Sequence, residues 1–116
     1  MIEQLRPADF AAWVASLAPG QPIVLDVREP WEVQTASVKP NGFALLCIPM
    51  QSLPARVAEL IALQGLDTPI ACLCHHGVRS QQVASYLQRQ GFTRVVNLQG
   101  GIAAWADQLD PSIATY

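Results

Sequence analysis

The fold follows from one stretch, residues 69–87, which reads PIACLCHHGVRSQQVASYL. Its first part, Ile70 to Cys74, is a short apolar run without charges, the pattern of a strand that is buried on both faces. After Gly77, apolar residues recur on one face of a helix, at Val83, Ala84, Tyr86 and Leu87. The stretch therefore predicts a strand, a tight loop and a helix in succession, which is one unit of a parallel sheet.

The same kind of apolar run returns elsewhere and predicts further strands, at Ile23 to Val27, Ala44 to Ile48 and Arg94 to Leu98. Apolar residues at helical spacing predict helices over residues 10–17, 53–61 and 102–109. Strands that alternate with helices over these distances indicate a parallel sheet that is covered by helices on both faces. No repeat, linker or low-complexity tract interrupts the pattern, so residues 1–116 are expected to form one domain.

The composition argues against several classes of function. The 116 residues are 51% hydrophobic and 14% charged with a net charge of −2, so no basic surface for nucleic acid or an anionic membrane is expected. No segment approaches the ~18 apolar residues of a membrane span. The first ten residues carry Glu3, Arg6 and Asp9, unlike a secretory signal. Three cysteines, an odd number, argue against a disulfide framework, and a reducing cytoplasm is the expected location.

Cys74 is the candidate nucleophile of the chain. Only a thiolate is nucleophilic, and an unperturbed cysteine, with a pKa of about 8.5, is mostly protonated at neutral pH. Gly77 can adopt backbone angles that turn successive N–H groups toward one point. Arg79 adds a permanent charge, and the helix that follows begins with N–H groups without partners. We therefore expect this loop to stabilise a thiolate, a persulfide or a small oxyanion on a sulfur that solvent can reach.

The chain resembles the rhodanese family, sulfurtransferases that carry a sulfane sulfur on one cysteine. Three segments carry the resemblance in order along nearly the whole sequence: DVRE at residues 26–29, CHHGVRS at 74–80 and VVNLQGGIAAW at 95–105. The resemblance implies a rhodanese-like three-layer α/β/α fold with a central parallel sheet of about five strands. Carried over to this sequence, it makes Cys74 the catalytic residue and gives an anion-binding loop of His75, His76, Gly77, Val78, Arg79 and Ser80.

The resemblance also implies a reaction that needs no cofactor and no metal. The Cys74 thiolate would attack the outer sulfur of a donor such as thiosulfate and release sulfite, and the resulting persulfide would pass its sulfur to cyanide, a thiol or a protein acceptor. Two alternatives stay open at this point: a sulfur relay that serves a protein partner, and a non-catalytic interaction module with the same fold. A small phosphatase or arsenate reductase is disfavoured, because the loop from Cys74 to Arg79 has six residues and the related phosphatases carry one more.

Asp26 and Arg28 lie at the carboxyl end of a predicted strand, where open α/β sheets bind their ligands. We expect both to support the loop rather than to take part in the chemistry. Arg28 is expected to pair with Glu29, Glu32 or the substrate, or to form only a surface ion pair of little value. His75 and His76 belong to the loop, where at least one should face the pocket mouth and can add positive charge without acting as an acid or base.

The other two cysteines have alternative interpretations. Cys72 and Cys74 are two residues apart on a predicted strand and should point to the same face. They could bind a metal together with His75 and His76, form a disulfide, or simply pack in the core. We favour packing in the core for both Cys72 and Cys47. Residues 37–42 depart from the glycine-histidine pair that many rhodaneses carry there, so the pocket rim, and with it the natural donor and acceptor, is left open.

Overall fold

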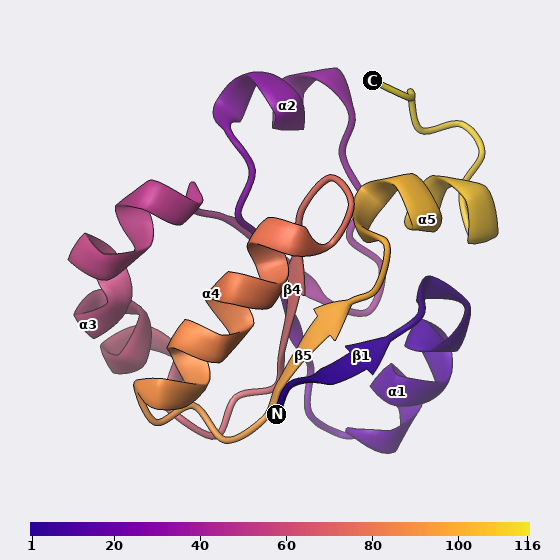
Figure 1. The fold of residues 1–116 in the computed structure, drawn as a ribbon. Helices are drawn as coiled ribbons and strands as arrows, with labels where there is room; N and C mark the ends of the chain where they lie inside the picture. Colours follow the sequence, from indigo (N-terminus) through magenta and orange to yellow (C-terminus); the bar gives the residue numbers. More distant parts are fainter.

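The computed structural model describes all 116 residues and shows a five-stranded parallel sheet between helices (Figure 1). The strands lie in the order β1-β5-β4-β2-β3. Their bounds are Glu3–Leu5 for β1, Ile23–Asp26 for β2, Ala44–Cys47 for β3, Ile70–Leu73 for β4 and Val95–Leu98 for β5. The helices are α1 (Phe10–Ser16), α2 (Pro30–Thr35), α3 (Leu53–Gln64), α4 (Val78–Arg89) and α5 (Gly101–Gln108). The three-layer architecture predicted from the sequence is confirmed.

The central strands β2 and β4 are buried over their whole length, which explains why their sequences show no polar alternation. Successive residues of β4 still face opposite layers. Ile70 and Cys72 belong to the apolar cluster that includes residues of α3 and α4, whereas Ala71 and Leu73 belong to the cluster of α1 and α5. In the second cluster, Phe10 packs edge-on against the rings of Phe43 and Trp105 at 5.3 and 5.0 Å between centroids.

Two elements were not predicted as such. β1 has only three residues, and its place in the sheet comes from its pairing with β5, Glu3 with Val96 through Leu5 with Leu98. α2 is a six-residue helix that begins with Pro30 in its first turn. The main-chain N–H of Glu29 donates to Oε1 of Glu32 at 3.1 Å and so ties down the start of this helix. α2 lies beyond the carboxyl ends of the strands (Figure 1), beside the loop that joins β4 to α4.

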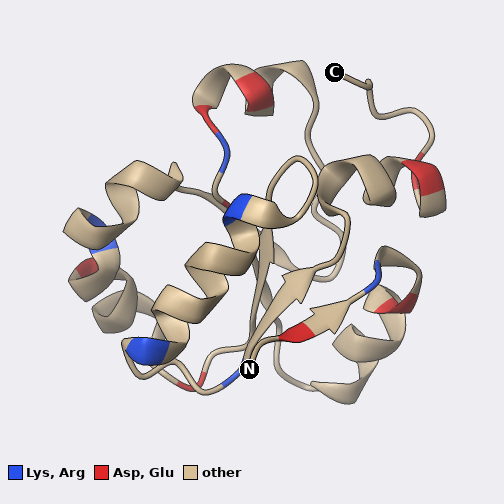
Figure 2. Ribbon diagram, in the orientation of Figure 1, with Lys and Arg blue, Asp and Glu red and all other residues tan.

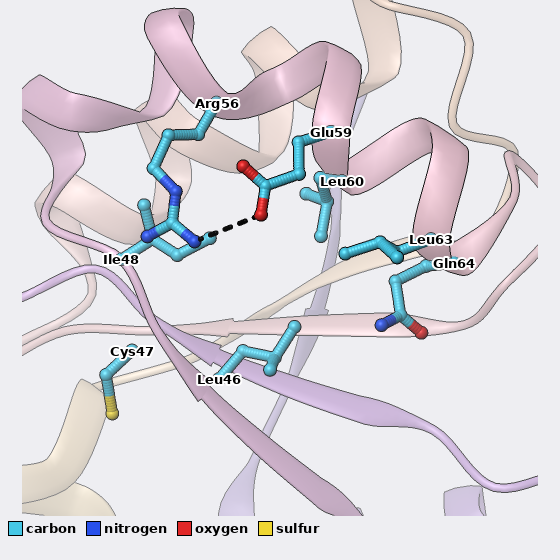
Figure 3. Close-up of a pocket in the computed structure, with 8 residues that line it drawn as sticks. All are labelled: Leu46, Cys47, Ile48, Arg56, Glu59, Leu60, Leu63 and Gln64. Atoms are coloured by element: carbon cyan, nitrogen blue, oxygen red, sulfur yellow. Dashed lines mark ion pairs between the residues drawn. The ribbon is translucent and has the colours of Figure 1, made fainter.

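The predicted packing of Cys47 in the core is wrong. β3 forms one edge of the sheet, and Cys47 at its end is exposed. Figure 3 shows the hollow between β3 and α3, where Leu46 and Leu63 approach one another while the sulfur of Cys47 points away from Arg56 and Glu59 of the helix. Leu45 and Leu46 in the middle of β3 are half-buried, one against each layer of helices, whereas Ala44 and Cys47 at the ends of this edge strand are exposed.

The charged residues are scattered over helices and loops and form no basic stripe (Figure 2). None of the helices combines the length and the apolar character that a bilayer crossing requires.

Candidate active site

The candidate site is the loop between β4 and α4, at the carboxyl end of the sheet. β4 ends at Leu73, the loop turns at Gly77, and α4 begins at Val78. Gly77 has φ 98°, a left-handed conformation that disfavours side chains. The loop lies next to α2 on one side and the start of α5 on the other (Figure 1).

The sulfur of Cys74 receives main-chain hydrogen bonds from this loop. The N–H groups of Gly77 and Ser80 donate to Sγ at 3.0 and 3.3 Å, as a nest of inward-turned amides does for an anion. The N–H groups of His75, His76, Val78 and Arg79 have no acceptor in the protein. The predicted arrangement of main-chain donors around this loop is therefore present, with donor capacity beyond what Sγ alone uses.

The expectation that solvent reaches the sulfur freely is not met, because Cys74 is only 1% exposed. Its side chain belongs to the same apolar cluster as Val83 and Ala84 of α4, which cover it from the helix side. A sulfur bonded to Sγ would extend about 2.05 Å further. The sulfur of Cys74 is therefore almost completely enclosed in this structure.

The first turn of α5 fixes the loop through its main chain. Ile102 N–H donates to the carbonyl oxygen of Cys74 at 2.8 Å, and Ala103 N–H donates to that of His75 at 3.2 Å. Because the loop carbonyls are held by α5, the loop N–H groups remain available to an anion. Gly101, at φ 62°, makes this approach possible, since a Cβ there would lie 2.4 Å from both carbonyl oxygens.

A second support runs through Ser80 and Asn97 behind the sulfur. Asn97 donates to the carbonyl oxygen of Gly77 at 3.2 Å and to Gln4 Oε1 at 2.9 Å, so its own Oδ1 faces Ser80. Ser80 Oγ donates its one proton to that oxygen at 2.6 Å and lies 3.2 Å from the sulfur of Cys74. In this arrangement Ser80 Oγ accepts from the Cys74 thiol.

Arg79 does not present a bare positive charge to the pocket. Its two terminal nitrogens donate to Oε1 and Oε2 of Glu32 in α2 at 2.6 and 2.8 Å. The hydrogen bonds from Arg79, assisted by those of Glu29 N–H and Tyr116, lower the pKa of Glu32 to about 2 despite its burial. The permanent charge that Arg79 was expected to add to the loop is thus compensated by Glu32, and Arg79 anchors the loop to α2.

Arg28 is completely buried and pairs with Asp26, not with the carboxylates of Glu29 or Glu32, with substrate or with a surface partner as expected. Its guanidinium donates to Asp26 at 2.7 and 2.9 Å and to the main-chain oxygens of Glu32 and Ala36. Burial alone would lower the pKa of Arg28, but its hydrogen bonds to Asp26 and Tyr116 raise it above the ordinary value. This pair therefore holds α2, and with it the carboxylate of Glu32, at the end of β2.

His75 presents an aromatic face to its two neighbouring rings. Its ring stacks on Tyr116 at 3.9 Å and 8° between planes, and on His76 at 3.9 Å and 25°. Burial, followed by the neighbouring His76, lowers the pKa of His75. The lowered pKa disfavours the charged form of the His75 ring, while His76 is exposed.

The sequence matches the rhodanese-like domain family over residues 10–108. The chain belongs to this family. It is 35% identical to the thiosulfate sulfurtransferase GlpE of Pseudoalteromonas translucida, with 72% of this chain and 71% of that protein covered. It is 39% identical to the chloroplastic rhodanese-like/PpiC domain-containing protein 12 of Arabidopsis thaliana, of whose length it spans only 30%. A solved rhodanese-related protein from Thermoplasma volcanium has a similar fold, with a TM-score of 0.72, 26% identity and 97% of each chain covered.

Within this rhodanese-like domain, sequence reasoning missed three residues that position the loop: Glu32, Asn97 and Tyr116. Asn97 carries a signal that could have found it, since a buried amide in the apolar strand VVNL needs partners for its hydrogen bonds. Glu32 follows Glu29 at the spacing of a helix start. Tyr116, which donates to Glu32 at 2.8 Å, carries no sequence signal. Cys72 is buried without any disulfide, as expected for packing, and this burial raises the pKa of its thiol.

Proposed function

We propose that this rhodanese-like protein transfers a sulfane sulfur from a donor such as thiosulfate to a thiophilic acceptor through a persulfide on Cys74. The observation that carries the proposal is the set of main-chain N–H groups at the loop. Two of them already donate to Sγ, and four more have no acceptor in the protein. Such a set suits a charged terminal sulfur that lies one bond beyond Sγ.

The proposed cycle has two half-reactions. In the first, the Cys74 thiolate attacks the outer sulfur of thiosulfate, a bond forms between the two sulfurs, and sulfite leaves with the electron pair of the broken S–S bond. In the second, cyanide, a thiol or a protein cysteine attacks the outer sulfur of the persulfide and regenerates the Cys74 thiolate. Neither half-reaction needs a metal or an organic cofactor.

Each neighbour of Cys74 has a defined part in this proposal. The loop amides hold the charge on the outer sulfur, and Ser80 together with Asn97 keeps Sγ in place. Arg79 keeps the loop attached to Glu32 instead of binding the donor. Residues 1–116 would act as one domain in the reducing cytoplasm, where the thiol stays unoxidised.

Intact mass spectrometry tests the proposal. After prolonged treatment with excess thiosulfate, the wild type should gain one sulfur atom, about 32 Da, and Cys74→Ser should gain none. The exposed Cys47 is replaced by serine in both proteins, so that it cannot collect sulfur at the surface. Equal gains with and without Cys74 would contradict the assignment. Hydrolysis of an aryl phosphate that depends on Cys74, without any gain in mass, would favour the phosphatase alternative.

A further inference from the structure

The two edge strands of the sheet differ in the residues that they present to solvent. β1 carries the charge of Glu3, and a charged side chain is a common device that keeps an edge strand from pairing with another chain. β3 has no charged residue, and Ala44 and Cys47 at its two ends are exposed. The edge at β3 is therefore open to a further strand.

The hydrogen-bonding groups at this open edge follow from the pairing of β3 with β2. The N–H groups of Ala44 and Ile48 donate at 3.1 and 3.0 Å to main-chain oxygens on the side of β2. Because alternate residues of a parallel strand bond to opposite neighbours, Leu45 and Cys47 direct their N–H and C=O groups away from β2. β3 has no other neighbour in the sheet, so these outward groups have no partner in the protein.

The set of outward groups is short, and both of its limits are defined. The chain bends at Phe43, before β3 begins, and Pro49 beyond its end has no N–H to donate. A strand that satisfies all the outward groups must have two outward residues of its own, separated by one residue. A second copy of β3 that runs in the opposite direction meets this requirement, with Leu45 of each copy opposite Cys47 of the other.

The side chains beside the edge suit a second copy as well. Leu46 is half-buried and faces α3, where Leu63 is 72% exposed (Figure 3). Arg56 and Glu59 of α3 line the same hollow and lie 3.6 Å apart, so this surface carries one charge of each sign. An identical surface that approaches it meets an apolar patch and no net charge.

We infer that β3 is the interface through which two copies of this chain associate, antiparallel about a twofold axis at Leu46. Each pair of Leu45 and Cys47 exchanges two main-chain hydrogen bonds, and the five strands of each copy join into one continuous sheet. The two copies of Leu46 form the pair without hydrogen bonds at the axis, with Cα atoms about 4.5 Å apart. So small an interface makes the dimer reversible.

The Cys74 loop takes no part in this contact. β2 separates β3 from β4, the strand that leads into the loop. The inference therefore goes beyond the proposed sulfur transfer and does not depend on it, since loading of Cys74 and association of β3 are measured separately.

Disulfide cross-linking tests the register of the two strands. In the Cys47→Ser background, Leu46→Cys places two thiols at the axis, where the Cα separation of about 4.5 Å permits a disulfide, whereas Leu45→Cys faces a serine. Both positions are half-buried, so they are matched in access to solvent. Under oxidation by diamide, we expect Leu46→Cys to form the covalent dimer at least about 10-fold faster than Leu45→Cys. Equal rates, or faster cross-linking at position 45, would overturn the inference.

Sedimentation velocity measures the association itself, with a reductant present so that the exposed Cys47 forms no disulfide. Between about 10 µM and about 1 mM protein, the wild type should shift from monomer to dimer. Cys47→Pro removes one outward N–H from each copy and leaves the bonds to β2 in place, as proline at a sheet edge can.

We expect Cys47→Pro to raise the dissociation constant about 10-fold or more, and the matched variant Cys47→Ser, which keeps this N–H, to change it by less than about 3-fold. Circular dichroism checks that the proline variant is folded, and the cross-linking rates decide the question if it is not. A wild type that stays monomeric throughout, or a folded Cys47→Pro that dimerises as tightly as the wild type, would overturn the inference.

Discussion

Cys72 and Cys74 stand two residues apart in the chain, on the same face and in the same apolar cluster, and yet their surroundings differ in chemistry. Their exposed fractions are 0 and 1%, so burial does not distinguish them. What differs is the main chain around each sulfur. Cys72 lies inside β4, where the strand pairs with β2 and β5, whereas Cys74 lies beyond the ladder, where unpaired N–H groups can turn toward its sulfur. The end of the strand thus gives the sulfur of Cys74 main-chain hydrogen-bond donors.

The largest difference in transfer rate should appear when each of the two cysteines is replaced in turn. We expect Cys74→Ser to lower the rate of sulfur transfer by about three orders of magnitude or more, because the attacking atom is lost. Cys72→Ala should leave the transfer rate within about 3-fold of the wild type and cost roughly 1–2 kcal/mol of folding stability through the small cavity it leaves. Transfer assays measure the rates and chemical denaturation measures the stability of the two variants. A large loss of transfer in Cys72→Ala would show that the two cysteines do not differ in their roles.

The second test moves the main chain of the Cys74 loop without touching a side chain of the site. In Gly101→Ala, the new Cβ meets the carbonyl oxygens of Cys74 and His75 at 2.4 Å, so the loop must shift, and we expect transfer to fall about 100-fold. Gly65→Ala is the control for backbone strain without a clash, because its φ of 82° is also positive but its nearest neighbour is 4.0 Å away. Gly65→Ala should lose about 1–3 kcal/mol of stability through backbone strain, and Gly101→Ala should lose at least as much because the clash adds to the strain. Similar transfer rates in the two variants would show that the placement of the loop matters little.

Acid should act on the Cys74 loop through Glu32, whereas Cys72 has no such ion pair beside it. Because the pKa of Glu32 in the folded protein is lowered from 4.5 to about 2, its contribution to stability is complete above pH 4.5 and is lost as the pH falls through about 2. Between pH 4.5 and about 2, the free energy of unfolding of the wild type should fall by roughly 2 kcal/mol because of Glu32. Glu32→Gln should lack this part of the fall. Denaturant titrations at a series of pH values measure it. An unchanged pH profile in the variant would mean that other carboxylates account for the decline.

The smallest effect is expected from the hydroxyl behind the sulfur. Ser80→Ala keeps the main-chain N–H that donates to Sγ and removes the contacts of the hydroxyl with Sγ and with Asn97 Oδ1, so transfer should fall by about 10-fold or less. We expect the loss of transfer to be largest in Cys74→Ser, smaller in Gly101→Ala and smallest in Ser80→Ala. This ranking is a stricter test than the size of any single loss. A loss in Ser80→Ala larger than that in Gly101→Ala would assign the difference between the two cysteines to side chains and not to the main chain.

Much of this architecture could be predicted because it depends on local pattern. The apolar runs of β2 and β4, the helical spacing behind Gly77 and the position of Cys74 at a strand end are visible in the sequence itself. The partners of Arg79 and Arg28 could not be predicted from the sequence, because they depend on the positions of α2 and Tyr116 in the folded protein. Cys47 was misplaced for a related reason: an apolar run indicates a strand but does not say whether that strand lies at an edge.

The bonds from Ile102 and Ala103 to the loop carbonyls have a consequence for how this protein can be altered. They depend on backbone atoms only, while the side chains of His76 and Val78 point to solvent and that of His75 is partly open. We therefore expect positions 76 and 78 to tolerate substitution without a change in the loop's shape, whereas the His75 ring stacks on Tyr116. If the proposed sulfur transfer holds, a library at positions 76 and 78 is a route to variants that accept a different partner at the mouth of the loop.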